Sequence, residues 1–187
     1  DPEEGRLVVF GGVDTATGLP LQTPLTALAG STTITALTSL VENLVSQGLT
    51  VEQANTAVTN ALSLPAGVDL SNIDPIVATT NNTPGGAATF AALVQVQNAI
   101  TQIAGLLDGA SSASTGDIVK NVVSALASQI QGGTTIDLTN ATQLQTVIQE
   151  AATLTNNVDV SAIASGASQV FAAAIKKFED IAASTPN

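Results

Sequence analysis

The stretch that decides the fold is TALTSLVENLVSQGLTVEQ, residues 35–53. Its apolar residues recur at the three- and four-residue spacing of an amphipathic helix, at Leu37, Leu40, Val41, Leu44 and Val45. Thr35 stands where a helix N-cap is expected, and Gly48 stands where a left-handed residue commonly follows a helix. The stretch therefore predicts a helix that begins at Thr35 and ends before Gly48.

A second helix is predicted directly after the first. Thr50 and Gln53 have the spacing of a capping box, in which each side chain bonds the backbone N–H of the other residue. The residues 51–62 then continue with an apolar stripe at helical spacing. Because only the dipeptide 48–49 separates the two helices, we expect them to form a tight helix pair.

The helical period returns through most of the remaining chain. We expect a short helix with Pro75 at its first position, and four longer helices, over 74–79, 88–107, 116–131, 140–154 and 159–183. The last-but-one of these opens on a second predicted capping box, Asn140 with Gln143. The predicted fold class is mainly α, a bundle of about six helices preceded by a short β-hairpin or β-arm.

The first thirty residues have a different pattern. Arg6–Phe10 is a short β-prone run, and residues 19–28 are suited to a second strand that two prolines restrict to a sheet edge. We predict a β-arm over 1–30 packed on a helical bundle over 31–187, the two together forming a single domain. The run Leu7–Phe10 is too apolar to remain in water, so we expect this arm to lie against the bundle and to resist proteolysis.

One four-residue pattern, apolar–Asp–apolar–Ser/Thr, occurs three times, each time before a predicted helix. The three copies are Val68-Asp69-Leu70-Ser71, Ile136-Asp137-Leu138-Thr139 and Val158-Asp159-Val160-Ser161. An Asp and a hydroxyl can satisfy the free N–H groups at a helix start, and the flanking apolar residues can staple the turn. The alternative is that the three Asp residues gather a cation. We favour capping, because caps recur at nearly every predicted helix start.

Composition restricts the partners of the chain. Fifteen acidic and four basic residues give a formal net charge of −11, which repels nucleic acid and anionic lipid. No apolar run reaches the roughly 18 residues that span a bilayer, so we expect no membrane insertion. The chain opens on Asp1-Pro2-Glu3-Glu4, and we expect a mature protein or an excised domain without a signal peptide.

The same composition restricts the chemistry. There is no His and no Cys, which removes the imidazole base, the Ser-His-Asp triad and the thiolate or imidazole metal site. A pair of carboxylates is sufficient to catalyse glycoside hydrolysis. The chain, however, also lacks Trp and Tyr, the side chains on which sugar rings usually stack. We predict no enzyme activity, no catalytic residue, no cofactor site and no metal site. The carboxylates left as candidates for a catalytic pair are Asp14, Glu42, Asp74, Asp108 and Glu150.

One segment, Asp14–Gly18, is a candidate calcium site, because it offers a carboxylate and several other oxygen atoms. The segment lacks the alternating acidic ligands and the distal Glu of an EF-hand loop. We interpret it as an ordinary turn that Asp opens and Gly closes.

Three segments carry a resemblance to a known group of proteins: residues 11–20, 34–41 and 48–54, the last continued by Leu64-Pro65 and Asp69-Leu70. Together they resemble a helical module of very large secreted bacterial surface proteins of cyanobacterial type, which also carry cadherin-like, VCBS-type or RTX repeats. That pattern has Pro where Ala36 stands here, and Ala is acceptable at the first helical position.

This resemblance implies a non-catalytic spacer, adhesion or assembly role outside the cell or on its surface, with other surface domains or a polysaccharide as partners. The composition agrees with it, because charged residues are only 10% of the chain and its polarity comes from Thr, Ser, Asn and Gln. Two alternatives stay open. One is a helical module that binds an apolar small molecule, and the other is a carboxylate-only glycosidase or lyase.

Overall fold

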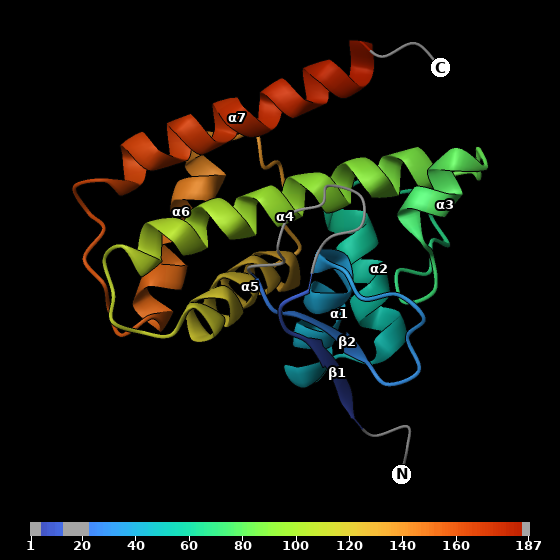
Figure 1. Cartoon of the computed structure of the whole chain (residues 1–187), viewed down its shortest axis with the longest axis horizontal. Helices are drawn as coiled ribbons and strands as arrows, with labels where there is room; N and C mark the ends of the chain where they lie inside the picture. Colours follow the sequence, from blue (N-terminus) through green and yellow to red (C-terminus); the bar gives the residue numbers. More distant parts are fainter. Residues whose placement is uncertain (1–4, 13–22, 185–187) are drawn as a thin grey trace.

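The computed structural model describes residues 5–12 and 23–184. In these residues, seven helices and one two-stranded antiparallel sheet form the molecule (Figure 1), which confirms the predicted mainly helical fold with an N-terminal hairpin. The elements are β1 (Arg6–Val9), β2 (Leu25–Leu28), α1 (Ala36–Ser46), α2 (Val51–Ala61), α3 (Pro75–Thr80), α4 (Gly86–Asp108), α5 (Thr115–Gln131), α6 (Ala141–Leu154) and α7 (Ala164–Ser184).

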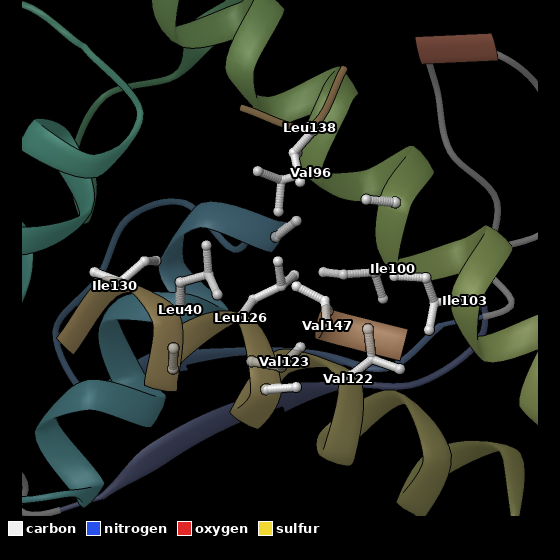
Figure 2. Packing of buried hydrophobic residues seen from close by; sticks show 14 of the residues in the cluster. Leu40, Val96, Ile100, Ile103, Val122, Val123, Leu126, Ile130, Leu138 and Val147 are labelled. Atoms are coloured by element: carbon white, nitrogen blue, oxygen red, sulfur yellow. The ribbon is translucent and has the colours of Figure 1, made fainter. Parts of the chain in front are cut away.

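The helices surround one continuous apolar cluster. Helix α1 contacts β2, α2, α4 and α5, whereas α7 contacts α4 and α6 (Figure 1). Figure 2 shows how Leu40 of α1, Val96 of α4, Leu126 of α5 and Val147 of α6 meet in this cluster. Its large buried side chains are all Leu and Ile, with Ala and Val between them. These short aliphatic side chains allow the helices to lie close together.

Helices α3 and α4 lie in close contact at the start of α4. A Cβ atom added to Gly86 would lie 2.5 Å from the carbonyl carbon of Ala78 in α3, so only glycine fits there. Gly85 before it has a φ of 84°, in the left-handed region that favours glycine. Helix α4 therefore begins at Gly86, two residues before the predicted start at residue 88.

The predicted caps of the first helices are confirmed. The hydroxyl oxygens of Thr35 and Thr50 accept the N–H groups of Thr38 and Gln53, both at 3.2 Å. Gly48, with a φ of 104°, ends α1 as predicted. These contacts are local in sequence, which is why residue spacing alone identifies them.

Of the predicted capping box at α6, the Asn140 cap is confirmed and the reciprocal bond from Gln143 is wrong. Asn140 caps the helix through the N–H groups of Thr142 and Gln143, at 2.9 and 3.2 Å. The Gln143 side chain, however, does not turn back to Asn140. Its Oε1 accepts the N–H of Asp137 at 2.8 Å, so it ties the preceding loop to the helix.

The three copies of the apolar–Asp–apolar–Ser/Thr pattern share one structure, and it differs from the capping prediction. In each copy the Asp Oδ1 accepts the N–H two residues ahead, which closes a tight turn outside the helix: Ser71 at 3.0 Å, Thr139 at 2.9 Å and Ser161 at 2.9 Å. The apolar residue inside each turn, which is Leu70, Leu138 or Val160, is buried in the core. The pattern thus anchors loops to the core.

The same turn corrects the start of the last helix. That helix was expected from residue 159, but α7 begins at Ala164. The Ser161 N–H is already bonded to Asp159, and residues 161–163 form a turn whose Ile163 N–H donates to the Val160 carbonyl at 3.0 Å. An Asp in this position competes with helix formation because it offers the backbone a different partner.

The hairpin has one covered strand and one exposed strand. Ala27 of β2 is fully buried against the bundle, whereas Leu7 and Val8 of β1 are 38% and 40% exposed and Phe10 is 73% exposed. The expectation that Leu7–Phe10 would be buried is therefore wrong, because β1 packs mainly against β2 and little else covers it.

Candidate functional site

The hairpin and two helices enclose a groove of about 460 Å³. Its lining comes from β1 with Phe10 after it, from Pro24 and Thr26 at β2, from α1, and from the first half of α5 with Ser114 before it. Its apolar and charged lining includes Val8, Phe10, Arg6, Lys120, Glu42 and Asp117.

The strand register determines which main-chain groups of β1 face β2. Leu7 pairs with Ala27, and the Ala29 N–H donates to the Gly5 carbonyl at 3.0 Å. Hydrogen-bonded and non-hydrogen-bonded pairs alternate in an antiparallel ladder. Leu7 and Val9 therefore direct their N–H and C=O groups toward β2, whereas Arg6 and Val8 direct theirs away from it.

The opposite edge of the sheet is closed by two hydroxyl groups of α1. The Thr26 N–H donates to Ser39 Oγ at 2.9 Å. The Thr26 carbonyl oxygen lies 2.9 Å from Thr38 Oγ1 and 3.1 Å from Ser39 Oγ. Since Thr26 lies opposite Val8 in the ladder, its main-chain groups are those that a third strand would pair. The helix hydroxyls take the place of that strand.

Charges of both signs line the groove. The Thr26 hydroxyl donates to Glu42 Oε2 at 3.2 Å, and the Ser114 hydroxyl donates to Asp117 Oδ2 at 2.7 Å. Each carboxylate is therefore already bonded within the protein. Arg6 comes from β1 and Lys120 from α5, and both side chains are exposed.

Sequence reasoning missed this arrangement. Thr38 and Ser39 are adjacent polar residues in the first turn of an apolar helix, and that pattern is the only trace of their role in the sequence. Their partner Thr26 lies 12 and 13 residues earlier, beyond the reach of helical spacing.

The candidate carboxylates are distributed over different elements. Among the four candidates in the described residues, Glu42 alone lines the groove. Asp74 caps α3 by accepting the N–H groups of Ile76 and Val77 at 2.9 and 3.0 Å. Asp14 lies outside the described residues.

The other two candidates tie neighbouring helices. Asp108, the last residue of α4, accepts the hydroxyl of Thr115 at 3.1 Å, across the loop to α5. Glu150 of α6 accepts the Gln129 side-chain amide of α5 at 3.1 Å. Each of the four described carboxylates therefore has a partner in the fold.

The three repeated Asp residues also stay separate, one in each loop. Among residues 5–12 and 23–184, no group of three acidic residues is arranged to hold a metal ion. The Ser161 hydroxyl, followed by the Ser161 N–H, lowers the pKa of Asp159 below its ordinary value. This carboxylate is therefore held in its ionised form by its own turn.

A second, shallower hollow of about 310 Å³ lies between α2 and the loop after it. Asn55 shapes one side of it. Its Nδ2 donates to the Val68 carbonyl at 2.8 Å, and its Oδ1 accepts the Leu70 N–H at 3.0 Å. Glu52 and Asp69 also line this hollow. Both hollows carry charged groups, so neither resembles the apolar cavity that a small apolar ligand requires.

Comparison of the chain with models of protein families, with curated proteins and with solved structures gives no match. The resemblance to bacterial surface modules therefore remains a proposal.

One helix of the described part, α4, is long and apolar enough to cross a membrane by length and composition alone. A core helix meets the same criteria, and the inward face of α4 contributes Val96, Ile100 and Ile103 to the apolar cluster.

Proposed function

We propose that the chain is a non-catalytic structural or adhesive module of an extracellular bacterial surface protein. One observation carries this proposal: every candidate carboxylate in the described residues accepts a hydrogen bond from a strand residue, from a helix start or from a neighbouring helix. A catalytic acid or base is usually a group whose surroundings shift its pKa toward neutrality, often by burial or by a close like charge. The described candidate carboxylates instead accept hydrogen bonds within the fold, and they are distributed over four different elements.

The surface supports a role in contact rather than in chemistry. Its polar side chains are largely hydroxyls and amides, among them the exposed Asn60, Asn82 and Thr142. Such neutral groups suit many weak contacts with protein or polysaccharide. They also agree with the composition of the surface proteins that the first third of the chain resembles.

Protease treatment of intact source cells tests the proposal. An antibody raised against the full chain should stain unpermeabilised cells, and external protease should remove the staining. A cytoplasmic protein of the same cells, stained after permeabilisation, is the control and should survive the treatment. Staining that appears only after lysis would overturn the proposed location. Reading the gene on both sides of these codons adds a second test, because the proposal expects β-sandwich or RTX repeats in the same reading frame.

A further inference from the structure

Helix α7 has two apolar sides, and the fold uses only one of them. The helix packs on α4 and α6, which lie on one side of it in Figure 1, where α7 runs along an edge of the molecule. Its buried side chains are Ala164, Ser168, Ala172 and Ile175. A helix on the surface of a protein usually carries polar side chains on the side that faces away from the core.

The side of α7 that faces away from the bundle carries a row of residues that we name the α7 stripe. Its members follow one another at three- and four-residue spacing, so they share one side of the helix and of the turn before it: Ile163, Gly166, Val170, Ala173 and Lys177. All five are exposed, Val170 by 65% and Ile163 by 44%. A single apolar side chain on a surface is ordinary, whereas a continuous apolar row indicates an interaction surface.

The stripe is complementary in size to a second copy of itself. If two copies run antiparallel about position 168, residues equally far before and after that position lie at the same level. Val170 of one copy then lies beside Gly166 of the other, and Ala173 lies beside Ile163. Each level combines a large and a small side chain, so the two helices can lie close together. The protein's own fold does not require the glycine, because a Cβ atom on Gly166 would meet nothing within 4 Å.

Charge fits the same arrangement. Lys177 is the one charged member of the stripe, and it would lie level with the turn before α7 of the second copy, where Asp159 is exposed. A two-fold symmetric pair contains this contact twice. The net charge of −11 on each copy opposes association at long range, but salt at about 0.15 M screens charges that lie more than about 8 Å apart. The apolar contact is not screened.

The size of α7 limits the strength of such a pair. The helix has 21 residues and is therefore about 30 Å long. One helix pair of this length buries less than the roughly 800 Å² per partner of a standard stable interface. We therefore expect a weak dimer, with a dissociation constant on the order of 100 µM.

We propose that the α7 stripe binds a second copy of this chain, as an antiparallel pair of α7 helices in which Val170 of each copy packs beside Gly166 of the other. The inference concerns an interaction surface and goes beyond the structural role proposed above. It holds or fails independently of where the protein is located.

Sedimentation equilibrium of the full chain tests the proposal. Samples between about 10 µM and 1 mM, in about 0.15 M NaCl, should show a monomer–dimer equilibrium. A mass that stays monomeric up to about 1 mM would overturn the proposal and would leave the stripe to a partner of another kind.

Two glycine variants separate close packing from general hydrophobic attraction. Gly166→Leu makes the stripe more apolar but fills the space of Val170 of the second copy, so the dimer should be about tenfold weaker or worse. Gly105→Leu makes the same change on α4, where a Cβ atom also meets nothing within 4 Å, and should associate as the wild type does. Stronger association of Gly166→Leu, or equal effects of the two variants, would overturn the proposal. Circular dichroism shows whether each variant folds, and Gly166→Ala is the smaller step if leucine impairs folding.

Disulfide cross-linking tests the direction of the two helices. The chain has no Cys, so Ile163→Cys and Ala173→Cys each carry a single thiol. In the antiparallel pair the two positions lie beside each other, whereas each lies about 15 Å along the helix axis from the same position of the second copy. A mixture of the two variants should therefore form a disulfide-linked dimer that neither variant forms alone. Cross-linking of each variant with itself, as readily as in the mixture, would overturn the antiparallel arrangement.

Discussion

The main-chain N–H of Thr26 donates to the hydroxyl oxygen of Ser39 at 2.9 Å, across the contact between β2 and α1. The Ser39 side chain is 2% exposed, so water has little access to this bond. We predict that Ser39→Ala leaves the strand N–H without a partner and lowers the free energy of unfolding by about 1–3 kcal/mol. Urea unfolding measures the loss.

Ser46→Ala is the matched control for this prediction. Ser46 lies on the same helix, and its hydroxyl donates to the Asn43 carbonyl of that helix at 2.7 Å. Its removal leaves no strand group unbonded, so the change should stay within about 0.5 kcal/mol. Equal losses in the two variants would mean that the hydroxyl does not close the sheet edge.

Two glycines of α4 should respond in opposite directions to replacement by alanine. At Gly86 the new Cβ would lie 2.5 Å from the backbone of Ala78, so Gly86→Ala should cost about 1–3 kcal/mol or more by forcing α3 and α4 apart. At Gly105 a Cβ meets nothing within 4 Å, and alanine should stabilise the helix by about 0.5–1 kcal/mol. Thermal melts of the two variants show whether each substitution raises or lowers the stability. A stabilised Gly86→Ala would contradict the close approach.

The turn at Asp159 makes a prediction about pH. The folded pKa of Asp159 is lowered, chiefly by the Ser161 hydroxyl, so the stabilisation is present above the ordinary pKa of about 3.9 and is lost as the pH falls through the folded value. Ser161→Ala should raise the pKa of Asp159 toward its ordinary value. Carboxyl NMR titration measures it, with Thr80→Ala in α3 as a control that should leave it unchanged. An unchanged pKa in Ser161→Ala would show that the hydroxyl is not the cause.

Calcium should have little effect on the fold. In the described part of the chain the acidic residues do not gather into a metal site, and the sequence of Asp14–Gly18 lacks a calcium-loop pattern. Thermal melts with calcium and with chelator should give the same midpoint. A calcium-dependent rise of several degrees would reveal a site formed by ligands that neither the pattern nor the geometry identified.

The elements that sequence predicts well are those that depend on near neighbours. The pair α1 and α2 follows from apolar spacing, two Thr caps and Gly48, all contained within residues 35–53. The short α3 follows from Asp74 and Pro75 for the same reason. Caps and helical period are properties of a few consecutive residues, so the surrounding fold does not need to be known.

Sequence predicted less where one segment decides the structure of another. The exposure of Leu7–Phe10 depends on which helices contact β1, and a local sequence pattern does not contain that information. The groove needs β1, α1 and α5 together, so no local pattern in the sequence indicates that Glu42 and Lys120 line the same groove. The predicted start of α7 is wrong because an Asp at this position can either cap a helix or close a turn. The sequence does not distinguish these two roles, whereas the bond from the Ser161 N–H to Asp159 identifies the turn.

The central proposal is that the candidate carboxylates Glu42, Asp74, Asp108 and Glu150 serve the fold. Glu42 is the sharpest case, since among these four it alone lines the groove and it accepts the Thr26 hydroxyl at 3.2 Å. A double-mutant cycle with Thr26→Val and Glu42→Ala isolates their interaction from the general effect of removing one negative charge, because that effect is common to both backgrounds.

Urea unfolding of the four proteins in this cycle is the most direct measurement. The account predicts a favourable coupling of about 0.5–1.5 kcal/mol between Thr26 and Glu42. Two results together would contradict it: a coupling free energy of zero, and a Glu42→Ala variant that is more stable than the wild type. Such a gain in stability is typical of replacing a residue that is kept for activity at a cost in stability.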